Sequence, residues 1–167
     1  MMYSKAMIGA MLLAGASSLQ VGLITDIHLH LRYNSMVSEE GECIDGWGYP
    51  TTVNAPMGRY ECDCPATLVE TMFRRMKEAF GHSDVIFLAG DFPAHYTSMP
   101  VETHQNPKDT FSLLLDTFAG VNQMLAYYFP DTLILPAFGN NDTKYHDNPI
   151  PDEDRAFFYD YVYRLWF

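Results

Sequence analysis

Acidic, imidazole and amide side chains cluster at three places in the chain, and each cluster directly follows a short apolar run. The clusters are Asp26-Ile27-His28, Gly90-Asp91 and Gly139-Asn140-Asn141-Asp142. Oxygen and nitrogen ligands without a thiolate suit Zn, Mn, Fe or Mg ions. Two such ions about 3.5–4 Å apart activate a bridging water and stabilise in-line displacement at phosphorus. These residue types therefore favour hydrolysis of a phosphate ester by two divalent metal ions.

The spacing within the clusters suggests how two ions would be held. Asp26 and His28 are two residues apart, so alternating side chains place both on one side of the chain as a strand ends. Asp91 is a candidate bridge between the ions, and the amide oxygen of Asn140 is a candidate ligand of the second. Each cluster alone is a weak signal, because an Asp after a strand is often only a cap or turn residue. Three clusters in order, each after an apolar strand, indicate a site.

The elements that must position these clusters alternate along the chain. Apolar runs at 20–25, 85–89 and 132–137 predict strands, and helical spacing of apolar residues predicts helices over 65–80 and about 110–129. A last, aromatic helix is predicted from about residue 154 to the end of the chain. Strand–helix–strand–helix–strand order predicts an α/β fold with a mainly parallel sheet and right-handed crossovers. Reactive residues gather at the carboxyl edge of such sheets, which brings the three clusters together.

The sequence also predicts how the first helix begins and ends and what kind of segment precedes it. Asp63 or Cys64 is expected to cap the helix, with Pro65 in its first turn, and Gly81 to end it. Residues 31–62 are polar and Gly-rich, which predicts a long loop that is functional or stapled. One residue separates Cys62 from Cys64, which strains a bridge between them, so Cys43 is expected to pair with one or the other.

The first 18 residues are typical of a secretory signal peptide. Lys5 precedes an apolar run over 6–16, and small residues follow, with cleavage expected after Ala16 or Ser18. The alternatives are a buried first helix or an uncleaved membrane anchor. A signal peptide implies secretion or delivery to a lysosomal or vacuolar lumen, and it leaves residues 19–167 as one domain.

Composition narrows the classes of function. The chain has 167 residues, a net charge of −11 and 48% hydrophobic residues. This length fits one domain, and the hydrophobic content is sufficient for a core. The negative charge argues against non-specific binding to a nucleic-acid backbone and against docking on anionic membranes. No apolar run reaches the roughly 20 residues of a typical transmembrane helix.

Four sequence blocks resemble the calcineurin-like metallophosphoesterases and, more narrowly, the acid sphingomyelinase-like phosphodiesterases. They are Asp26-Ile27-His28, the GRYECD segment at 58–63, the GDFPAH segment at 90–95 and the GNND segment at 139–142. The stretch 139–148 is also similar to vacuolar endopolyphosphatases. The resemblance covers about residues 20–167. It implies a sheet core flanked by helices and phosphodiester hydrolysis at a two-metal site, with zinc favoured.

The resemblance also implies a role for each matching residue. Asp26 and His28 match ligands of the first metal, Asp91 matches the bridging carboxylate, and Asn140 matches a ligand of the second metal. His95 matches a histidine beside the scissile phosphate, which is a candidate proton donor to the leaving oxygen.

Further matches concern Asn141, Asp142 and the cysteines. The third block of the family usually reads Gly-Asn-His followed by an acid, and Asn141 stands at the His position. An amide can bond a phosphate oxygen but cannot transfer a proton, so acid catalysis would fall on His95. Asp142 is expected to orient Asn141 or a histidine. Cys62 matches a disulfide cysteine, which implies Cys43 as its partner.

The resemblance covers only part of the family's fold. The family has further histidine ligands in a second half, and no matching histidine block follows the third cluster here. The chain is therefore interpreted as the N-terminal βαβαβ half of the domain, with a sheet face or edge that the missing half would cover. Alone it is expected to have little phosphodiesterase activity. The remaining histidines are expected in loops or at the surface; they are His30, His82, His104 and His146.

Three functions stay open at this point. The first is a secreted metal-dependent phosphoesterase acting on a sphingolipid, a nucleotide or a polyphosphate. The second is a non-catalytic or degenerate secreted relative, which would explain both Asn141 and the missing half. The third is a small secreted module whose acidic loops bind cations such as Ca²⁺, although the chain has no loop with EF-hand spacing.

Overall fold

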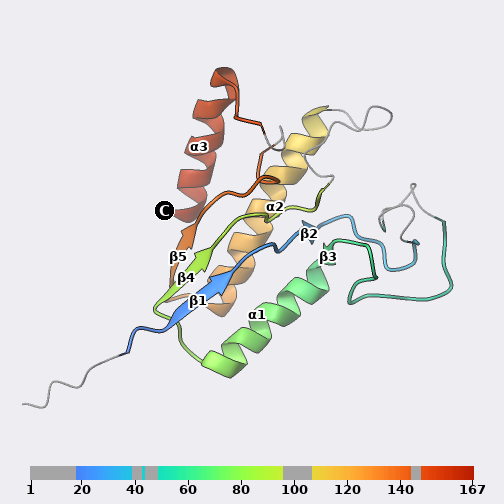
Figure 1. Cartoon of the computed structure of the whole chain (residues 1–167), viewed down its shortest axis with the longest axis horizontal. Coiled ribbons are helices and arrows are strands. Elements are labelled where there is room, and N and C mark those ends of the chain that lie inside the picture. The colour runs from blue at the N-terminus through green and yellow to red at the C-terminus, as the bar shows by residue number, and fades with distance from the viewer. Residues whose placement is uncertain (1–17, 39–42, 44–48, 96–106, 144–147) are drawn as a thin grey trace, which may run out of the picture.

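A three-stranded parallel sheet forms the centre of the structure, a computed structural model that describes residues 18–38, 43, 49–95, 107–143 and 148–167 (Figure 1). Its strands are β1 (Val21–Ile24), β4 (Val85–Leu88) and β5 (Leu133–Pro136), in the order β1-β4-β5. Apolar runs of four residues are long enough for such strands, and Pro136 ends the last of them. The fold is therefore mixed α/β with a parallel sheet, as the sequence predicts.

Three helices accompany the sheet: α1 (Ala66–Phe80), α2 (Pro107–Tyr128) and α3 (Asp152–Trp166). All three predicted helices are confirmed, with α2 and α3 starting two or three residues early. Proline has no backbone N–H, and the first N–H of a helix has no acceptor within the helix, so Pro107 is a favourable first residue for α2. The first turn of α3 contains three acidic residues, and their negative charge interacts favourably with the positive N-terminal end of the helix dipole.

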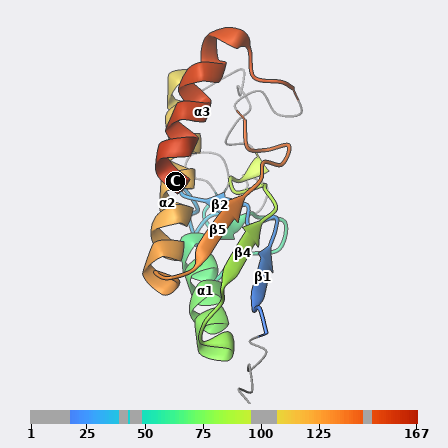
Figure 2. The same cartoon turned by 90° about the vertical axis from the view of Figure 1, so that its left-hand side faces the viewer.

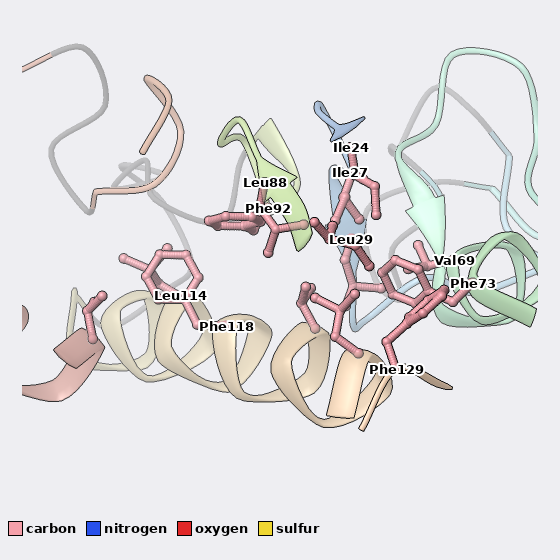
Figure 3. Close-up of a cluster of buried hydrophobic side chains, with 14 of the residues drawn as sticks. Ile24, Ile27, Leu29, Val69, Phe73, Leu88, Phe92, Leu114, Phe118 and Phe129 are labelled. Atoms are coloured by element: carbon pink, nitrogen blue, oxygen red, sulfur yellow. The ribbon is translucent and has the colours of Figure 1, made fainter. Parts of the chain in front are cut away.

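The helices cover one face of the sheet (Figure 2). Successive right-handed crossovers from β1 to β4 and from β4 to β5 move in one direction, which places α1 and α2 on the same side. Between this face and the helices lies the core, shown in Figure 3. The fully buried side chains at its centre include Phe73, Phe92, Phe118, Ile86 and Leu88.

The opposite face of the sheet is apolar and open to solvent among the described residues. Strand register puts Leu23 beside Phe87, and Val21 and Leu133 flank Val85. Leu23 is 70% exposed, Leu133 56%, Val21 53% and Phe87 43%. An uncovered sheet face of this kind is what the sequence predicts. We refer to these four exposed side chains as the open sheet face.

Two strands of two residues each lie outside the predicted pattern. β2 (Leu29–His30) and β3 (Cys64–Pro65) pair in parallel and extend the structure beyond the carboxyl edge of β1. β3 lies within the segment predicted as the start of the first helix. Leu29 also pairs with Pro93 in an isolated bridge, so three separate segments run side by side here.

Two predictions about single residues are wrong. Neither Asp63 nor Cys64 caps α1: its N-cap is Pro65, which makes no side-chain cap bond. His30 is not a surface residue but is only 7% exposed, in a strand that lies between β3 and the segment after β4, and burial lowers the pKa of His30.

Other predictions concern residues 1–17, His104 and His146, which lie outside the described residues. His82 is exposed, as predicted, and Gly81 ends α1. In the part of the chain that the structure describes, no helix combines the length and the apolar content needed to cross a membrane.

Candidate metal centre

The three polar clusters meet at the carboxyl edge of the sheet. The segment after β1 lies against the segment after β4: the Asp26 N–H donates to the Gly90 carbonyl (3.2 Å), and the His28 N–H donates to the Asp91 carbonyl (3.0 Å). The loop after β5 joins them through the Ala137 N–H, which donates to the Leu88 carbonyl (2.7 Å). The juxtaposition that parallel topology predicts is therefore present.

Two glycines allow the second and third clusters to approach backbone to backbone. Gly90 has a φ of +93°, and a Cβ there would collide with the backbone of Phe138 and Gly139. A Cβ at Gly139 would collide with the carboxylate of Asp91. The glycines that begin these two blocks are thus required by packing and, at position 90, also by backbone conformation.

The ligand atoms of Asp26, His28 and Asp91 lie within 4.8 Å of one another. His28 Nε2 is 3.7 Å from Asp26 Oδ1. The other ring nitrogen of His28, Nδ1, is 3.2 Å from the Pro93 carbonyl, which can only accept a hydrogen bond. Nδ1 therefore carries the proton, and in the neutral ring Nε2 keeps a free lone pair, as a metal-ligating histidine requires.

The backbone at these residues is unusual. Asp26, His28 and Asp91 have φ values of 52°, 43° and 54°, in the left-handed region that residues other than glycine rarely adopt. Such conformations cost about 1–3 kcal/mol each and persist where the surrounding structure enforces them. The strain coincides with the three residues whose side chains converge.

Asn141 lies directly behind Asp91. Its backbone N–H donates to Asp91 Oδ1 (2.8 Å), and its side-chain Nδ2 is 3.3 Å from the same oxygen. Asn141 is only 2% exposed, and its Oδ1 is buried without a hydrogen-bond partner. Asn140, the preceding residue in the loop, is exposed.

Asp142 fastens the loops together. Oδ2 accepts from the backbone N–H groups of Gly139 (2.6 Å) and Asp91 (2.7 Å), and Oδ1 accepts from that of Phe92 (2.9 Å). The residue is fully buried, and burial raises the pKa of its carboxyl to about 6 despite these three bonds. Its contacts in this structure are thus with the backbone of both clusters.

His95 reaches the centre from the end of the GDFPAH block. Its ring stacks on that of His28, with centroids 4.2 Å apart and planes 9° apart. Asp63 accepts two hydrogen bonds from His95, one from the backbone N–H (2.8 Å) and one from ring Nδ1 (2.9 Å). Sequence reasoning missed this role of Asp63. The available signal was its place in the GRYECD block, one of the four blocks that carry the resemblance.

A disulfide joins Cys43 to Cys62, directly before Asp63. It confirms the pairing that the resemblance implies and decides between the two pairings left open by spacing. Cys64 is a free thiol of intermediate exposure, and burial raises its pKa.

The donor set fits a divalent cation. Two carboxylates and one imidazole converge with a free nitrogen lone pair, and a buried amide oxygen without a partner lies next to them. Oxygen and nitrogen donors of this kind bind zinc, manganese, iron or magnesium. The structure thus brings Asp26, His28 and Asp91 together as a candidate metal centre.

Comparison with known proteins finds sequence similarity to several phosphodiesterases. No protein-family model matches the chain. It is 28% identical over 154 residues to acid sphingomyelinase-like phosphodiesterase 3b of Mus musculus, covering 92% of this chain and 31% of the relative. It is 26% identical over 123 residues to sphingomyelinase phosphodiesterase C of Dictyostelium discoideum, covering 72% of this chain and 26% of the relative.

A further relative is the human cyclic GMP-AMP phosphodiesterase SMPDL3A, 24% identical over 119 residues, which cover 71% of this chain and 24% of the relative. The chain thus spans a quarter to a third of the length of these relatives. Their names describe phosphodiesterases, in agreement with the four sequence blocks and with the candidate metal centre. The chain is therefore a relative of the acid sphingomyelinase-like phosphodiesterases.

Proposed function

We propose that this chain is part of a metal-dependent phosphodiesterase with a calcineurin-like metallophosphoesterase fold. The observation that carries the proposal is the convergence of Asp26, His28 and Asp91 at the carboxyl edge of a parallel sheet, within 4.8 Å of one another. This edge is where parallel α/β folds bind ligands. The similarity to phosphodiesterases supports the reaction class.

The chain supplies four ligands in this proposal. Asp26 and His28 would hold one ion, Asp91 would contribute to both ions, and Asn140 would hold the second. When bound, two divalent ions activate water and neutralise charge on the phosphate oxygens. The resemblance favours zinc. The proton on His28 Nδ1, held by the Pro93 carbonyl, keeps Nε2 available as the ligand atom.

His95 is the proposed proton donor to the leaving oxygen. Its side chain is 53% exposed, so a substrate can reach it, and stacking on His28 keeps it beside the centre. Asn141 is proposed to help bind the phosphate. Because an amide cannot transfer a proton, His95 carries the acid role alone.

The open sheet face supports the proposal that the domain is larger than this chain. Apolar side chains in register on a sheet normally pack against another layer. We propose that residues 19–167 form the N-terminal half of the domain, that the other half covers this face, and that it supplies the remaining metal ligands. The lengths of the relatives are consistent with a larger domain.

We propose phosphodiesters as the substrate class. The relatives are named for sphingomyelin and for cyclic GMP-AMP, and both compounds are phosphodiesters. Polyphosphate, suggested by the 139–148 segment, remains the alternative substrate. A signal peptide over residues 1–18 and the Cys43–Cys62 disulfide are consistent with secretion or a lysosomal or vacuolar lumen.

Metal binding by the chain tests the first part of the proposal. We expect calorimetric titration with Zn²⁺ or Mn²⁺ to detect weak binding, because the ligand set is incomplete. Asp91→Asn should weaken it at least tenfold, whereas Asp160→Asn, on the exposed surface of α3, should leave it unchanged. Equal binding by wild type and Asp91→Asn would contradict the assignment.

A chimera tests the reaction. The matching segment of the mouse phosphodiesterase 3b is replaced by the corresponding segment of this chain, and hydrolysis of bis(p-nitrophenyl) phosphate is measured with Mn²⁺ or Zn²⁺. We expect turnover that Asp91→Asn abolishes. This chain alone should hydrolyse the same substrate only slowly. If this chain alone hydrolysed it readily and Asp91→Asn abolished that activity, the proposal that its metal site is incomplete would be refuted.

The burial of Asn141 against Asp91 favours one alternative, a non-catalytic relative that keeps the metal centre. In that case the chimera binds metal and does not hydrolyse the phosphodiester. Asn141→His then separates the causes, because restored turnover would identify position 141 as the site of the loss.

A further inference from the structure

Asp63 holds His95 at two points. Its Oδ2 accepts the backbone N–H of His95 at 2.8 Å, and its Oδ1 accepts ring Nδ1–H at 2.9 Å. A carboxylate that binds both the main chain and the ring of one residue restricts rotation about both side-chain torsions. The ring of His95 is thereby fixed relative to its own backbone.

Asp63 is itself fixed on both sides. Cys62 precedes it and is bonded covalently to Cys43. Cys64 follows it in β3, and the Cys64 N–H donates to the carbonyl of His28, a proposed metal ligand (3.0 Å). The Asp63 carboxylate is only 18% exposed, which limits screening of its bonds by water. Its position is therefore set relative to the candidate metal centre.

The two bonds also select a tautomer. A carboxylate can only accept, so the proton of the neutral His95 ring lies on Nδ1 and the free lone pair lies on Nε2. His28 has the same arrangement through the Pro93 carbonyl, and the two rings are stacked. Nε2 is thus the atom of His95 that remains available for exchange of a proton with a bound substrate.

From this geometry we infer that Asp63 is a positioning residue, which orients His95 and fixes its tautomer. The inference rests on the proposed function insofar as His95 is the proton donor. The ligand atoms of His28, Asp63 and His95 also lie within 4.8 Å of one another, as a metal group could. However, Nδ1 of each ring already donates a hydrogen bond, to Pro93 and to Asp63, so we interpret Asp63 and His95 as a hydrogen-bonded pair.

The tautomer can be measured without any activity. In long-range ¹H–¹⁵N spectra of the full chain labelled at histidine and kept in EDTA, His95→Gln assigns the signals of His95. We expect neutral His95 to have a protonated Nδ1 and a bare Nε2. Asp63→Asn should shift the ring toward the Nε2-protonated form, and Asp160→Asn should not. A wild-type ring protonated on Nε2 would overturn the inference, and this result does not depend on whether Asp63→Asn folds.

The chimera supplies the kinetic readout. Asp63→Asn should lower kcat roughly tenfold or more at nearly unchanged KM, as expected when a partner that orients a catalytic group is lost. Asp63→Glu, which keeps an acceptor, should recover part of kcat. An unchanged kcat in a chimera that turns over would refute the positioning role. A chimera without turnover would instead contradict the proposed function and leave the tautomer measurement as the deciding test.

Discussion

Phe87 and Leu88 are neighbours on β4 whose side chains point to opposite faces of the sheet, and they should respond very differently to the same substitution. Leu88 is 1% exposed in the core, whereas Phe87 is 43% exposed on the open sheet face. Leu88→Thr removes a buried side chain and places a hydroxyl in the core. We expect it to lower the free energy of unfolding by about 3–5 kcal/mol.

The expected cost of Phe87→Thr is much smaller. Complete burial of a Phe side chain contributes about 1.5–3 kcal/mol, and a little over half of this one is out of water. The loss in this chain should be about 1 kcal/mol, a third or less of the loss at Leu88.

Urea unfolding followed by circular dichroism measures both variants, with light scattering to establish the oligomeric state. In the chimera, where we propose that another layer covers the face, Phe87→Thr should cost about 3 kcal/mol or more. Equal losses for the two variants in the monomeric chain would refute the reasoning. No increase in the cost at Phe87 on going to the chimera would refute the proposed covering.

Three more predictions follow from the site and its surroundings. Burial raises the pKa of Asp142 to about 6 from an ordinary 3.8, so between these values the folded chain keeps a proton that the unfolded chain loses. This group should therefore lower the free energy of unfolding of the EDTA-treated chain by about 3 kcal/mol as pH rises from about 3 to 7, with no further change above that, and Asp142→Asn should remove this contribution. Denatured chain without reductant should show one free thiol, and in the folded chain Cys64 should react with iodoacetamide more slowly than free cysteine, because burial raises its pKa; three reactive thiols in the denatured chain would contradict the disulfide. Gly139→Ala, whose methyl group collides with the Asp91 carboxylate, should weaken Zn²⁺ binding at least tenfold in calorimetry. Gly120→Ala in α2, whose methyl group would make only ordinary contacts with Leu29 and Leu31, should leave it unchanged.

The sequence predicts the scaffold of the site well, for a physical reason. Short apolar runs such as 85–89, which Gly90 follows, favour strands, and parallel topology then fixes where Asp26 and Asp91 meet. The Cys43–Cys62 pairing is also correct, but it comes from the family resemblance, because spacing alone leaves Cys64 as an equal partner.

The errors concern contacts between residues distant in sequence. Asp63 is favoured as a helix cap by its local position, yet its partner His95 is 32 residues away. The pairing of β2 with β3 depends on a hydrogen bond from Cys64 to His28, which no local pattern encodes. The burial of His30 follows from that pairing, so it is missed for the same reason.

The contact between Gly90 and Gly139 separates the framework of the site from its chemistry. Main-chain atoms set the spacing of the two loops there, and the side chains at positions 140 and 141 take no part in that contact. A protein engineer could therefore exchange the exposed Asn140 for another ligand type while the loops keep their spacing. Metal preference would become a design variable that is adjusted by single substitutions on a backbone that stays the same.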